Sequence, residues 1–263
     1  MKSLDLKKDF LLPREIEKVL GTGTVEKIPI GESDSDVFRV HRKGREMLYL
    51  KVAASAAEVC LKTEVEKLNW LINYVKVPRI IHYEERDGFE YILMSAMEGV
   101  PSFSATEDRV QTIKEVARGL LQIHTIPLEE CPFVNDLNKK IEEARSRVKR
   151  KVVDEDDFDP EKQGRTAEDV FFQVLGDRPG SEDLVVTHGD YCMPNIIIKN
   201  GRLNGFIDVE WFGIADRYQD LAPAARSIER NFSKDHVDVF FKEYGIIPNR
   251  EKIEYFKLLD ELF

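Results

Sequence analysis

The sequence is poor in cysteine and has no long apolar run. Its three cysteines, Cys60, Cys131 and Cys192, are odd in number and far apart, which predicts neither a disulfide framework nor a metal-binding cluster. No apolar stretch approaches the roughly 20 residues of a membrane span, and the N-terminal segment lacks the apolar centre of a signal peptide. We therefore expect a cytoplasmic protein with reduced thiols and no membrane partner.

Positive charge is also in deficit. The chain has 39 Lys and Arg against 49 Asp and Glu, a formal net charge of −10. A field of this sign disfavours nucleic acid, so we expect no nucleic-acid partner and a cationic small molecule instead. Six of the carboxylates lie in the segment DEDDFDPE at 154–161. A solvated loop is the plain interpretation of such a run, and a surface that binds a cationic ligand is the alternative.

The 263 residues are enough for one large domain or two lobes, and they contain no internal repeat. Five short β-rich segments in the first half, bounded by turn residues, predict strands at 24–30, 36–41, 47–52, 79–83 and 90–94. Between the third and the fourth, apolar residues recur every three or four positions and predict a helix over 61–74. Asp87-Gly88 supplies the turn between the last two strands.

The second half of the chain is mainly helical in pattern. Residues 97–102 are the predicted hinge between two lobes, since the character of the sequence changes there. Ser104 and Glu107 have the spacing of a capping box, which predicts a helix from this point to about His124. A further helix is predicted over 135–149.

The segment 184–220 has the densest signal for chemistry. Its apolar runs at 184–186, 196–198 and 206–207 are the predicted strands of a buried sheet. Polar residues border these strands: Asp190 follows the first, Asn195 precedes the second and Asp208 follows the third. Because groups at strand ends lie at the edge of a sheet, where loops present them to ligands, we expect these three side chains to meet.

The spacing Asp190-x-x-x-x-Asn195 is typical of a kinase catalytic loop. In that loop the Asp accepts the proton of the attacking hydroxyl and the Asn oxygen holds Mg²⁺. Asp208 matches the carboxylate that binds Mg²⁺ at the nucleotide phosphates, and hard oxygen ligands suit this ion. The interpretation is Asp190 as catalytic base, with Asn195 and Asp208 as magnesium ligands.

A kinase also needs a cation for the phosphates, and Lys51 is the candidate in the strand-rich half. It ends the apolar strand Met47–Leu50, and Glu64 on the following helix is its predicted ion-pair partner. Glu66 is the competing residue, and either carboxylate can instead be a solvated helix residue. Glu64 is preferred because it lies three residues after Leu61, beside the buried face of the helix.

Several other residues receive structural interpretations. His188 is expected to brace the catalytic loop, because the neighbouring Asp190 already fills the role of the base. Cys192 is interpreted as a spacer rather than a nucleophile. Phe171 and Phe172 are expected in the core.

Five stretches together resemble the aminoglycoside phosphotransferases, and most of all the 3′-phosphotransferases that inactivate kanamycin and neomycin. They are YLK (49–51), IHTIPLEECPF (123–133), HGDYCMPN (188–195), FIDVEWFGIADRYQD (206–220) and LLDELF (258–263). The nucleotide and catalytic motifs also occur in choline kinases and other small-molecule kinases. The ADRYQD and LLDELF stretches are the more discriminating ones.

The resemblance implies an α+β, bilobal, protein-kinase-like fold. Residues 1–96 would form a nucleotide-binding lobe of antiparallel sheet with a helix, with a hinge near 95–101. Residues 102–263 would form a larger, mainly helical lobe for catalysis and substrate binding, with an acidic helical insertion at about 134–178. The implied activity is Mg²⁺-dependent transfer of the γ-phosphoryl of ATP, or GTP, to the 3′-hydroxyl of an aminoglycoside, which inactivates it. We expect a monomer or a weak dimer.

The resemblance also implies individual roles. On the nucleotide side, Lys51 would contact the α/β-phosphates with Glu64 as its partner, and Tyr49 would pack on the adenine. Ser95 and Met97 would offer hinge hydrogen bonds, and Ser33 would lie in the loop that covers the nucleotide. The residues implied to hold the aminoglycoside are acidic or terminal: Asp154, Asp156, Asp159, Glu229, Asp260, Glu261 and the Phe263 carboxylate.

Two departures from the family pattern lie on the implied substrate side. Arg230 stands where the family has an acidic contact, so either Glu229 substitutes for it or a positive charge replaces it. Glu210-Trp211 replaces a typical Gly-Arg. These changes motivate the alternative of a kinase for another small molecule, such as a macrolide, a choline-like amino alcohol or a sugar. A catalytically inactive nucleotide-binding module is a further alternative, disfavoured because Lys51, Asp190, Asn195 and Asp208 are all present.

Overall fold

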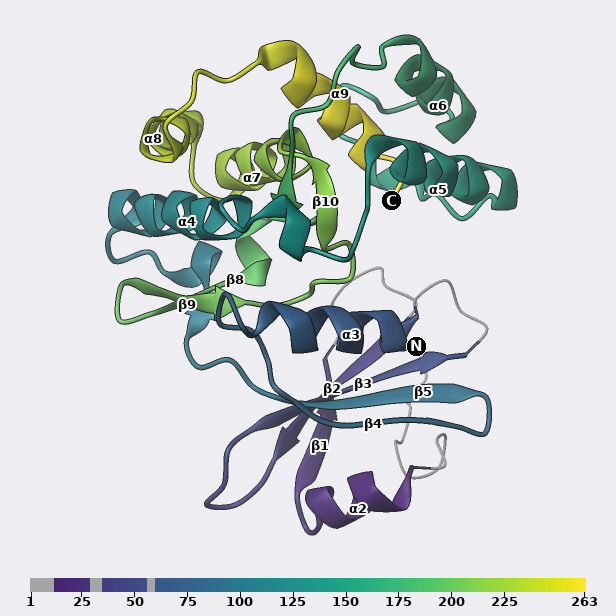
Figure 1. Cartoon of the computed structure of the whole chain (residues 1–263), viewed down its shortest axis with the longest axis vertical. Helices are drawn as coiled ribbons and strands as arrows, with labels where there is room; N and C mark the ends of the chain where they lie inside the picture. Colours follow the sequence, from purple (N-terminus) through teal and green to yellow (C-terminus); the bar gives the residue numbers. More distant parts are fainter. Residues whose placement is uncertain (1–11, 29–34, 56–59) are drawn as a thin grey trace. The chain divides into compact units, whose positions relative to one another are not determined.

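A computed structural model describes residues 12–28, 35–55 and 60–263 of the chain. The chain divides into two compact units, one ending at Glu98 and the other running from Gly99 to Phe263 (Figure 1). Across the described ranges, none of the helices is both long enough and apolar enough to cross a membrane. The three cysteines are free thiols, with Cys60 exposed, Cys131 buried and Cys192 half-buried.

The first unit is an antiparallel sheet with helices packed on it (Figure 1). Its strands are ordered β1-β2-β3-β5-β4. The elements are α2 (Arg14–Leu20), β1 (Thr24–Lys27), β2 (Ser35–His41), β3 (Leu48–Ala54), α3 (Leu61–Leu71), β4 (Ile80–Arg86) and β5 (Phe89–Ser95). The five predicted strands and the predicted helix are confirmed, and α2 is an element that the sequence patterns did not reveal.

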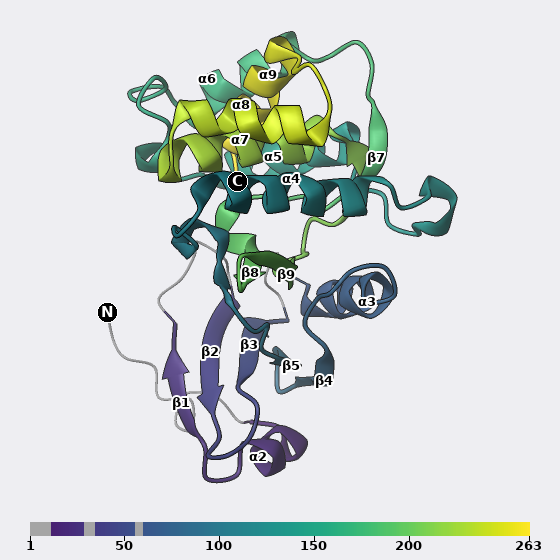
Figure 2. The same ribbon diagram turned by 90° about the vertical axis from the view of Figure 1, so that its left-hand side faces the viewer.

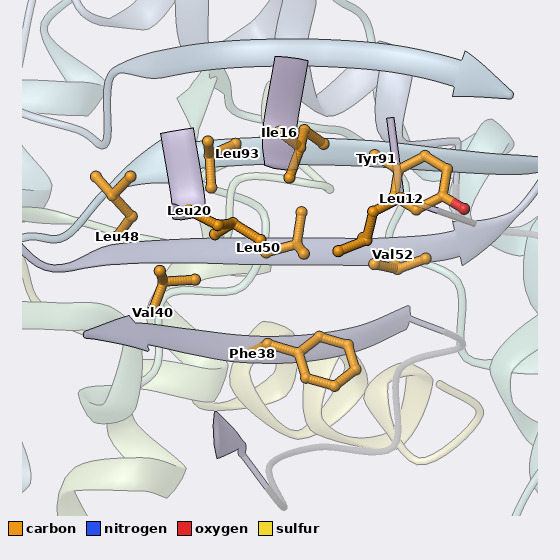
Figure 3. Packing of buried hydrophobic residues seen from close by; sticks show 10 residues of the cluster. All are labelled: Leu12, Ile16, Leu20, Phe38, Val40, Leu48, Leu50, Val52, Tyr91 and Leu93. Atoms are coloured by element: carbon orange, nitrogen blue, oxygen red, sulfur yellow. The ribbon is translucent and has the colours of Figure 1, made fainter. Parts of the chain in front are cut away.

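Side-chain alternation along β3 decides which groups face which helix. Leu48, Leu50 and Val52 are buried in one cluster with Ile16 and Leu20 of α2 (Figure 3). Because successive strand residues point to opposite faces, Tyr49, Lys51 and Ala53 lie on the other face, and Ala53 packs there with Leu61 of α3. The alternation therefore places Lys51 on the α3 side of the sheet.

The start of α3 is fixed to the sheet by a buried carboxylate. Glu90 of β5 accepts hydrogen bonds from the backbone N–H groups of Leu61 and Lys62, at 3.0 and 3.2 Å. The Tyr83 hydroxyl donates to the same carboxylate at 2.5 Å. The side chain of Cys60, the residue before the helix, makes no capping bond. A residue from a neighbouring strand therefore satisfies the helix N-terminus and fixes where α3 presents Glu64.

The second unit combines small sheets with helices. Its strands form the pair β7–β10 and the ladder β6-β8-β9, and Figure 2 shows α4 and α8 side by side. The strands are β6 (Val100–Pro101), β7 (Leu184–Thr187), β8 (Ile196–Lys199), β9 (Arg202–Phe206) and β10 (Gly213–Asp216). The helices are α4 (Arg109–His124), α5 (Leu137–Arg150), α6 (Ala167–Gly176), α7 (Tyr218–Asn231), α8 (Lys234–Tyr244) and α9 (Arg250–Asp260).

The predicted capping box at Ser104 and Glu107 is wrong. Residues 102–104 form a short 3₁₀ turn that is tied down by the Ser102 hydroxyl, which donates to the Met193 carbonyl at 2.8 Å. The helix begins only at Arg109, because Asp108 supplies the cap by accepting a 2.9 Å hydrogen bond from the Gln111 N–H.

The expectation that Phe171 and Phe172 both lie in the core is half wrong. Phe171 is buried, but Phe172 is 72% exposed. Both are residues of α6, and consecutive helical residues point about 100° apart, so one neighbour faces the core and the other faces solvent.

Candidate active site

The catalytic-loop residues come together at the ends of the second unit's strands. The Asn195 side-chain nitrogen donates to the Asp190 carboxylate at 2.7 Å and to the Asp190 carbonyl at 3.1 Å. The Ile207 N–H donates to the Asn195 carbonyl at 3.0 Å, which places the next residue, Asp208, beside this loop. The structure thus brings together the three side chains that the spacing predicted.

The environment of Asp190 disfavours ionisation of its carboxyl group. Burial raises the pKa of the Asp190 carboxyl, and the carboxylates of Asp260 and Asp208 raise it further. Asp208 has a backbone φ of +59°, in the left-handed region. A residue other than glycine costs of order 1–3 kcal/mol in such a conformation, and strain of this kind concentrates at functional sites.

Gly189 determines how closely the loop packs. Its φ is +92°, and a Cβ at this position would lie 2.1 Å from the Trp211 carbonyl oxygen. Any side chain here would both strain the backbone and collide with backbone atoms. Trp211 is therefore a direct neighbour of the turn that carries Asp190.

A buried carboxylate on α7 forms hydrogen bonds with the backbone of the catalytic loop. Asp220 accepts hydrogen bonds from the N–H groups of His188 and Gly189, at 2.7 and 2.8 Å. Its Oδ2 also lies 3.0 Å from the His124 Nε2, and the His124 Nδ1 lies 2.6 Å from the Tyr244 hydroxyl. Sequence reasoning missed this role, although Asp220 ends the ADRYQD stretch that carried the family resemblance.

His188 and Cys192 have the surroundings of structural residues. The fully buried His188 ring has its Nε2 3.1 Å from the Ile207 carbonyl and packs edge-on against Tyr191 and Phe206. Burial, together with the nearby Asp190 carboxylate, raises the pKa of the Cys192 thiol well above its ordinary value. A neutral thiol is a poor nucleophile, which agrees with the interpretation of Cys192 as a spacer.

The donor set around Asp190 fits magnesium. Among the residues that the structure describes, no group of three or more His, Cys, Asp or Glu side chains is arranged to hold a metal by itself. Asn195 turns its amide nitrogen to Asp190, which directs its amide oxygen away, and Asp208 offers an exposed carboxylate. Mg²⁺ typically takes one or two protein oxygens and completes its shell with phosphate and water, so these residues fit it.

On the nucleotide side, the first unit contains the predicted ion pair. The Lys51 ammonium lies 2.9 and 3.1 Å from the two Glu64 carboxylate oxygens, and both side chains are buried. Glu66, the competing residue, is exposed. Helix α3 therefore presents Glu64, and not Glu66, to Lys51.

The other nucleotide-side residues differ in how available they are. Tyr49 is half-buried on the same face of β3 as Lys51. The Ser95 N–H donates to the Arg79 carbonyl at 2.9 Å, and the Ser95 hydroxyl accepts from the Arg79 N–H at 2.9 Å. Met97 makes no hydrogen bond within the described ranges. Ser33 lies outside the described residues.

Three of the predicted acceptor carboxylates converge on one arginine of α7. Arg226 lies 3.7 Å from Asp159 and 3.3 Å from Glu261, and it also pairs with Asp260. The Glu261 carboxylate in turn accepts a 2.8 Å hydrogen bond from the Asp159 N–H. The acidic segment and the chain terminus are thus joined through a half-buried cation.

Arg230 reinforces this neutralisation. It forms an ion pair with Asp159, whereas Glu229 is exposed. At the position where the family has an acidic contact, a positive charge therefore compensates one of the predicted acceptor carboxylates. Asp159, Asp260 and Glu261, three of the residues implied to hold the aminoglycoside, are therefore paired with arginines of α7, and their role in acceptor binding stays a prediction.

The rest of the acidic run behaves differently. Asp154 and Asp156 are exposed. The Asp154 carboxylate accepts a 3.0 Å hydrogen bond from the Asp156 N–H and so caps the short 3₁₀ turn Glu155–Asp157. These two carboxylates match the solvated-loop interpretation of the run and remain accessible to a cationic ligand.

Arg226 and the carboxylates of Asp159, Asp260 and Glu261 form a group that we call the Arg226 cluster. Two of these carboxyl groups have pKa values shifted in opposite directions. Burial raises the pKa of Glu261 to about 7, and its hydrogen-bonded neighbour Asp159 contributes to the rise. Burial also opposes the ionisation of Asp159, but its hydrogen bond with Glu261 and the charges of Arg226 and Arg230 lower its pKa overall. Asp159 therefore ionises at a lower pH than Glu261.

The structure also places a buried lysine, which the sequence patterns did not reveal, beside Trp211. Lys140 of α5 is 5% exposed, and its ammonium lies 4.1 Å from the centre of the Trp211 ring and 3.8 Å from that of Phe263. The two rings meet edge to face, with centroids 5.2 Å apart. Burial lowers the pKa of Lys140, opposed most strongly by the carboxylates of Asp260 and Asp190.

Comparison with known proteins gives consistent relatives. The sequence profile of the phosphotransferase enzyme family matches residues 24–256. An aminoglycoside 3′-phosphotransferase of Niallia circulans is 36% identical, over 95% of this chain and 97% of its own length. A crystal structure of an aminoglycoside 3′-phosphotransferase of type VIII is 30% identical with a TM-score of 0.87, and the match covers 95% of this chain and 97% of that one. An aminoglycoside phosphotransferase of Streptomyces rimosus in complex with ADP and streptomycin is 27% identical with a TM-score of 0.83, over 94% of this chain and 95% of that one.

Proposed function

Because the chain belongs to the phosphotransferase enzyme family, we propose that it transfers the γ-phosphoryl group of ATP to a hydroxyl of an aminoglycoside and so inactivates it. The 3′-hydroxyl is the proposed acceptor, since the Niallia circulans relative and the type VIII structure are both 3′-phosphotransferases. Use of GTP in place of ATP stays a prediction, as do the cytoplasmic location, the monomeric or weakly dimeric state and the lack of a nucleic-acid partner.

The observation that carries the proposal is the hydrogen-bonded pair Asp190–Asn195 with Asp208 beside it. Phosphoryl transfer through a loose transition state needs positioning more than it needs a strong base. Asp190 would accept a hydrogen bond from the attacking hydroxyl, orient it towards phosphorus and take its proton as the new P–O bond forms. The bond from Asn195 holds the Asp190 carboxylate in one orientation for this task.

The nucleotide would bind through residues of the first unit, which we assign to residues 1–96. Lys51, held by Glu64, would contact the α/β-phosphates, with Tyr49 against the adenine. The Met97 backbone is better placed than that of Ser95 to bond the base, because the Ser95 N–H is already engaged. Asn195 and Asp208 would hold Mg²⁺, which when bound neutralises charge on the phosphates.

We assign residues 102–263 to catalysis and acceptor binding. The carboxylates proposed to meet a cationic sugar are the exposed Asp154, Asp156 and Glu229, together with the terminal carboxylate of Phe263. Asp260 would contribute together with Arg226. Such carboxylates would steer and orient a molecule that carries several ammonium groups.

Two observations favour the second candidate function, a kinase for a different small molecule. Arg230 neutralises Asp159, and the side chain of Trp211 stands beside the catalytic loop where the family has an arginine. A panel assay of ATP consumption with aminoglycosides, macrolides and choline separates the two functions. NMR of the phosphorylated product would then identify the modified hydroxyl. The intact Lys51–Glu64 pair supports activity over an inactive binding module.

The test of the proposed function compares two isosteric substitutions. Asp190→Asn should reduce phosphorylation by roughly a thousandfold or more, while the affinity for ATP, measured by thermal shift, changes little. Asp238→Asn, at an exposed position of α8, is the matched control and should keep full activity. Comparable turnover by Asp190→Asn and the parent protein would reject Asp190 as the catalytic base.

A further inference from the structure

The ammonium of Lys140 has a fixed position and uncommitted hydrogen-bond donors. It lies against the faces of Trp211 and Phe263, as close to their centres as 4.1 and 3.8 Å. Within the part of the chain that the structure describes, it has neither a hydrogen bond nor an ion pair, and its side chain is buried. A lysine ammonium carries three N–H donors and no acceptor. Because these donors have no partner among the described residues, a ligand that reaches the ammonium can accept hydrogen bonds from it.

The surroundings of Lys140 place it with the acceptor-binding residues. The backbone of Trp211 packs against Gly189, next to the proposed base Asp190. The charges that act most strongly on Lys140 are those of Asp260 and Asp190. The chain end that carries Phe263 is held in place by Arg147, whose Nε donates to the Leu262 carbonyl at 2.8 Å.

We propose that Lys140 is a specificity-determining residue that reads the substituent beside the reacting hydroxyl of the acceptor. This inference rests on the proposed function. The Lys140 ammonium donates a hydrogen bond to a hydroxyl at that position. An ammonium at the same position meets a like charge and cannot accept the bond, so acceptors with a hydroxyl next to the reacting group are preferred.

The aromatic pair makes this discrimination sharp. Two ring faces attract the ammonium and hold it in one place, so the side chain does not swing away from an unsuitable acceptor. In a partly desolvated site, both the hydrogen bond to a charged donor and the repulsion between like charges are stronger than in water. The acidic residues farther from Trp211 and Phe263 still attract the ammonium groups elsewhere on the antibiotic.

The experiment uses kanamycin A and kanamycin B, which differ only in a hydroxyl or an ammonium on the carbon next to the 3′-hydroxyl. The quantity measured is the ratio of kcat/KM for the two antibiotics. The parent protein should prefer kanamycin A, and Lys140→Met should reduce that preference by at least about tenfold. Lys140→Arg keeps the positive charge and should retain most of the preference. Lys139→Met, at the exposed neighbouring position of α5, should leave the ratio unchanged.

The outcomes separate the inference from the function on which it rests. If the parent protein phosphorylates neither kanamycin nor any other aminoglycoside, the proposed function fails and the role of Lys140 fails with it. If it phosphorylates them and Lys140→Met, folded by its melting temperature, keeps the parent ratio, only the inference is overturned. Equal losses with both antibiotics indicate a structural role and also reject it, as does an Arg variant that behaves like the Met variant.

Discussion

The catalytic loop and the acidic acceptor region lie in the same unit, but they differ in where their contacts come from. Asp190 and Asn195 are five residues apart and bond each other directly. Asp159 is joined to Arg230, 71 residues away, and to Glu261, 102 residues away. The geometry of a motif whose partners are close in sequence can be predicted from the motif itself. Whether a run of acidic residues is neutralised depends instead on basic residues from distant parts of the chain.

Among the substitutions that test this comparison, the largest effect is expected at Asp220, the carboxylate that supports the catalytic loop through long-range contacts. Asp220→Asn removes the charge that accepts the His188 and Gly189 N–H groups. We expect a loss of kcat of about a hundredfold and a fall in the free energy of unfolding of roughly 3–5 kcal/mol, because buried donors lose a charged acceptor. Steady-state kinetics and urea denaturation measure the two effects.

Asp235→Asn, at an exposed position of α8, is the matched control for Asp220→Asn and should change neither quantity appreciably. A parent-like kcat in Asp220→Asn would show that the Asp190–Asn195 motif positions itself without support. The geometry of the catalytic loop would then depend on contacts within the loop alone.

The next effect tests the acidic region itself. Arg226→Met leaves Asp159, Asp260 and Glu261 without their shared cation, and should lower the free energy of unfolding by roughly 2–4 kcal/mol. Arg230→Met removes a pair whose arginine is 54% exposed and should cost at most about 1 kcal/mol. Equal effects of the two substitutions in urea denaturation would contradict the view that Arg226 is the centre of the cluster.

The same contrast explains what the sequence could and could not predict. The strands of the first unit, the Lys51–Glu64 pair and the Asp190–Asn195–Asp208 group were predictable because each rests on side-chain periodicity or on partners close along the chain. Three other features were not predictable: the helix cap at Asp108, the hydrogen bonds from the catalytic loop to Asp220, and the packing of Lys140 against Trp211 and Phe263. Asp108 was missed because Ser104 also has the sequence pattern of a helix cap. The hydrogen bond from Ser102 to Met193, 91 residues away, holds residues 102–104 in a short turn, so the helix starts later. Lys140 lacked any local signal, since its ring partners come from residues 211 and 263.

A smaller effect is the pH dependence contributed by Glu261. Its pKa is about 7 in the folded protein and near 4.5 in the unfolded chain, so the folded state binds the proton more tightly. The stabilisation is complete below pH 4.5 and is lost as the pH rises to about 7, by roughly 1–3 kcal/mol. The low pKa of Asp159 acts below this window and does not oppose the trend.

Glu261→Gln isolates this contribution, because glutamine does not titrate. Relative to the parent protein, the variant should gain stability steadily between pH 4.5 and 7, as measured by urea denaturation across that range. Parallel pH profiles for the two proteins would show that Glu261 ionises normally in the fold.

The smallest effect is expected for the part of the acidic run that no arginine compensates. Asp154→Asn combined with Asp156→Asn should raise the aminoglycoside KM two- to fivefold at low salt, with the ATP KM unchanged, because exposed carboxylates attract a polycation through a screened field. At about 0.5 M salt the difference should largely disappear, and stability should change by less than about 0.5 kcal/mol. Asp156→Asn combined with Asp159→Asn should instead lower stability as well, since Asp159 belongs to the Arg226 cluster. If both double variants leave the drug KM unchanged at every salt concentration, the accessible carboxylates of the run are only a solvated loop. Acceptor recognition then lies with the other proposed residues, which are Asp190, Lys140, Glu229, Asp260 and the Phe263 carboxylate.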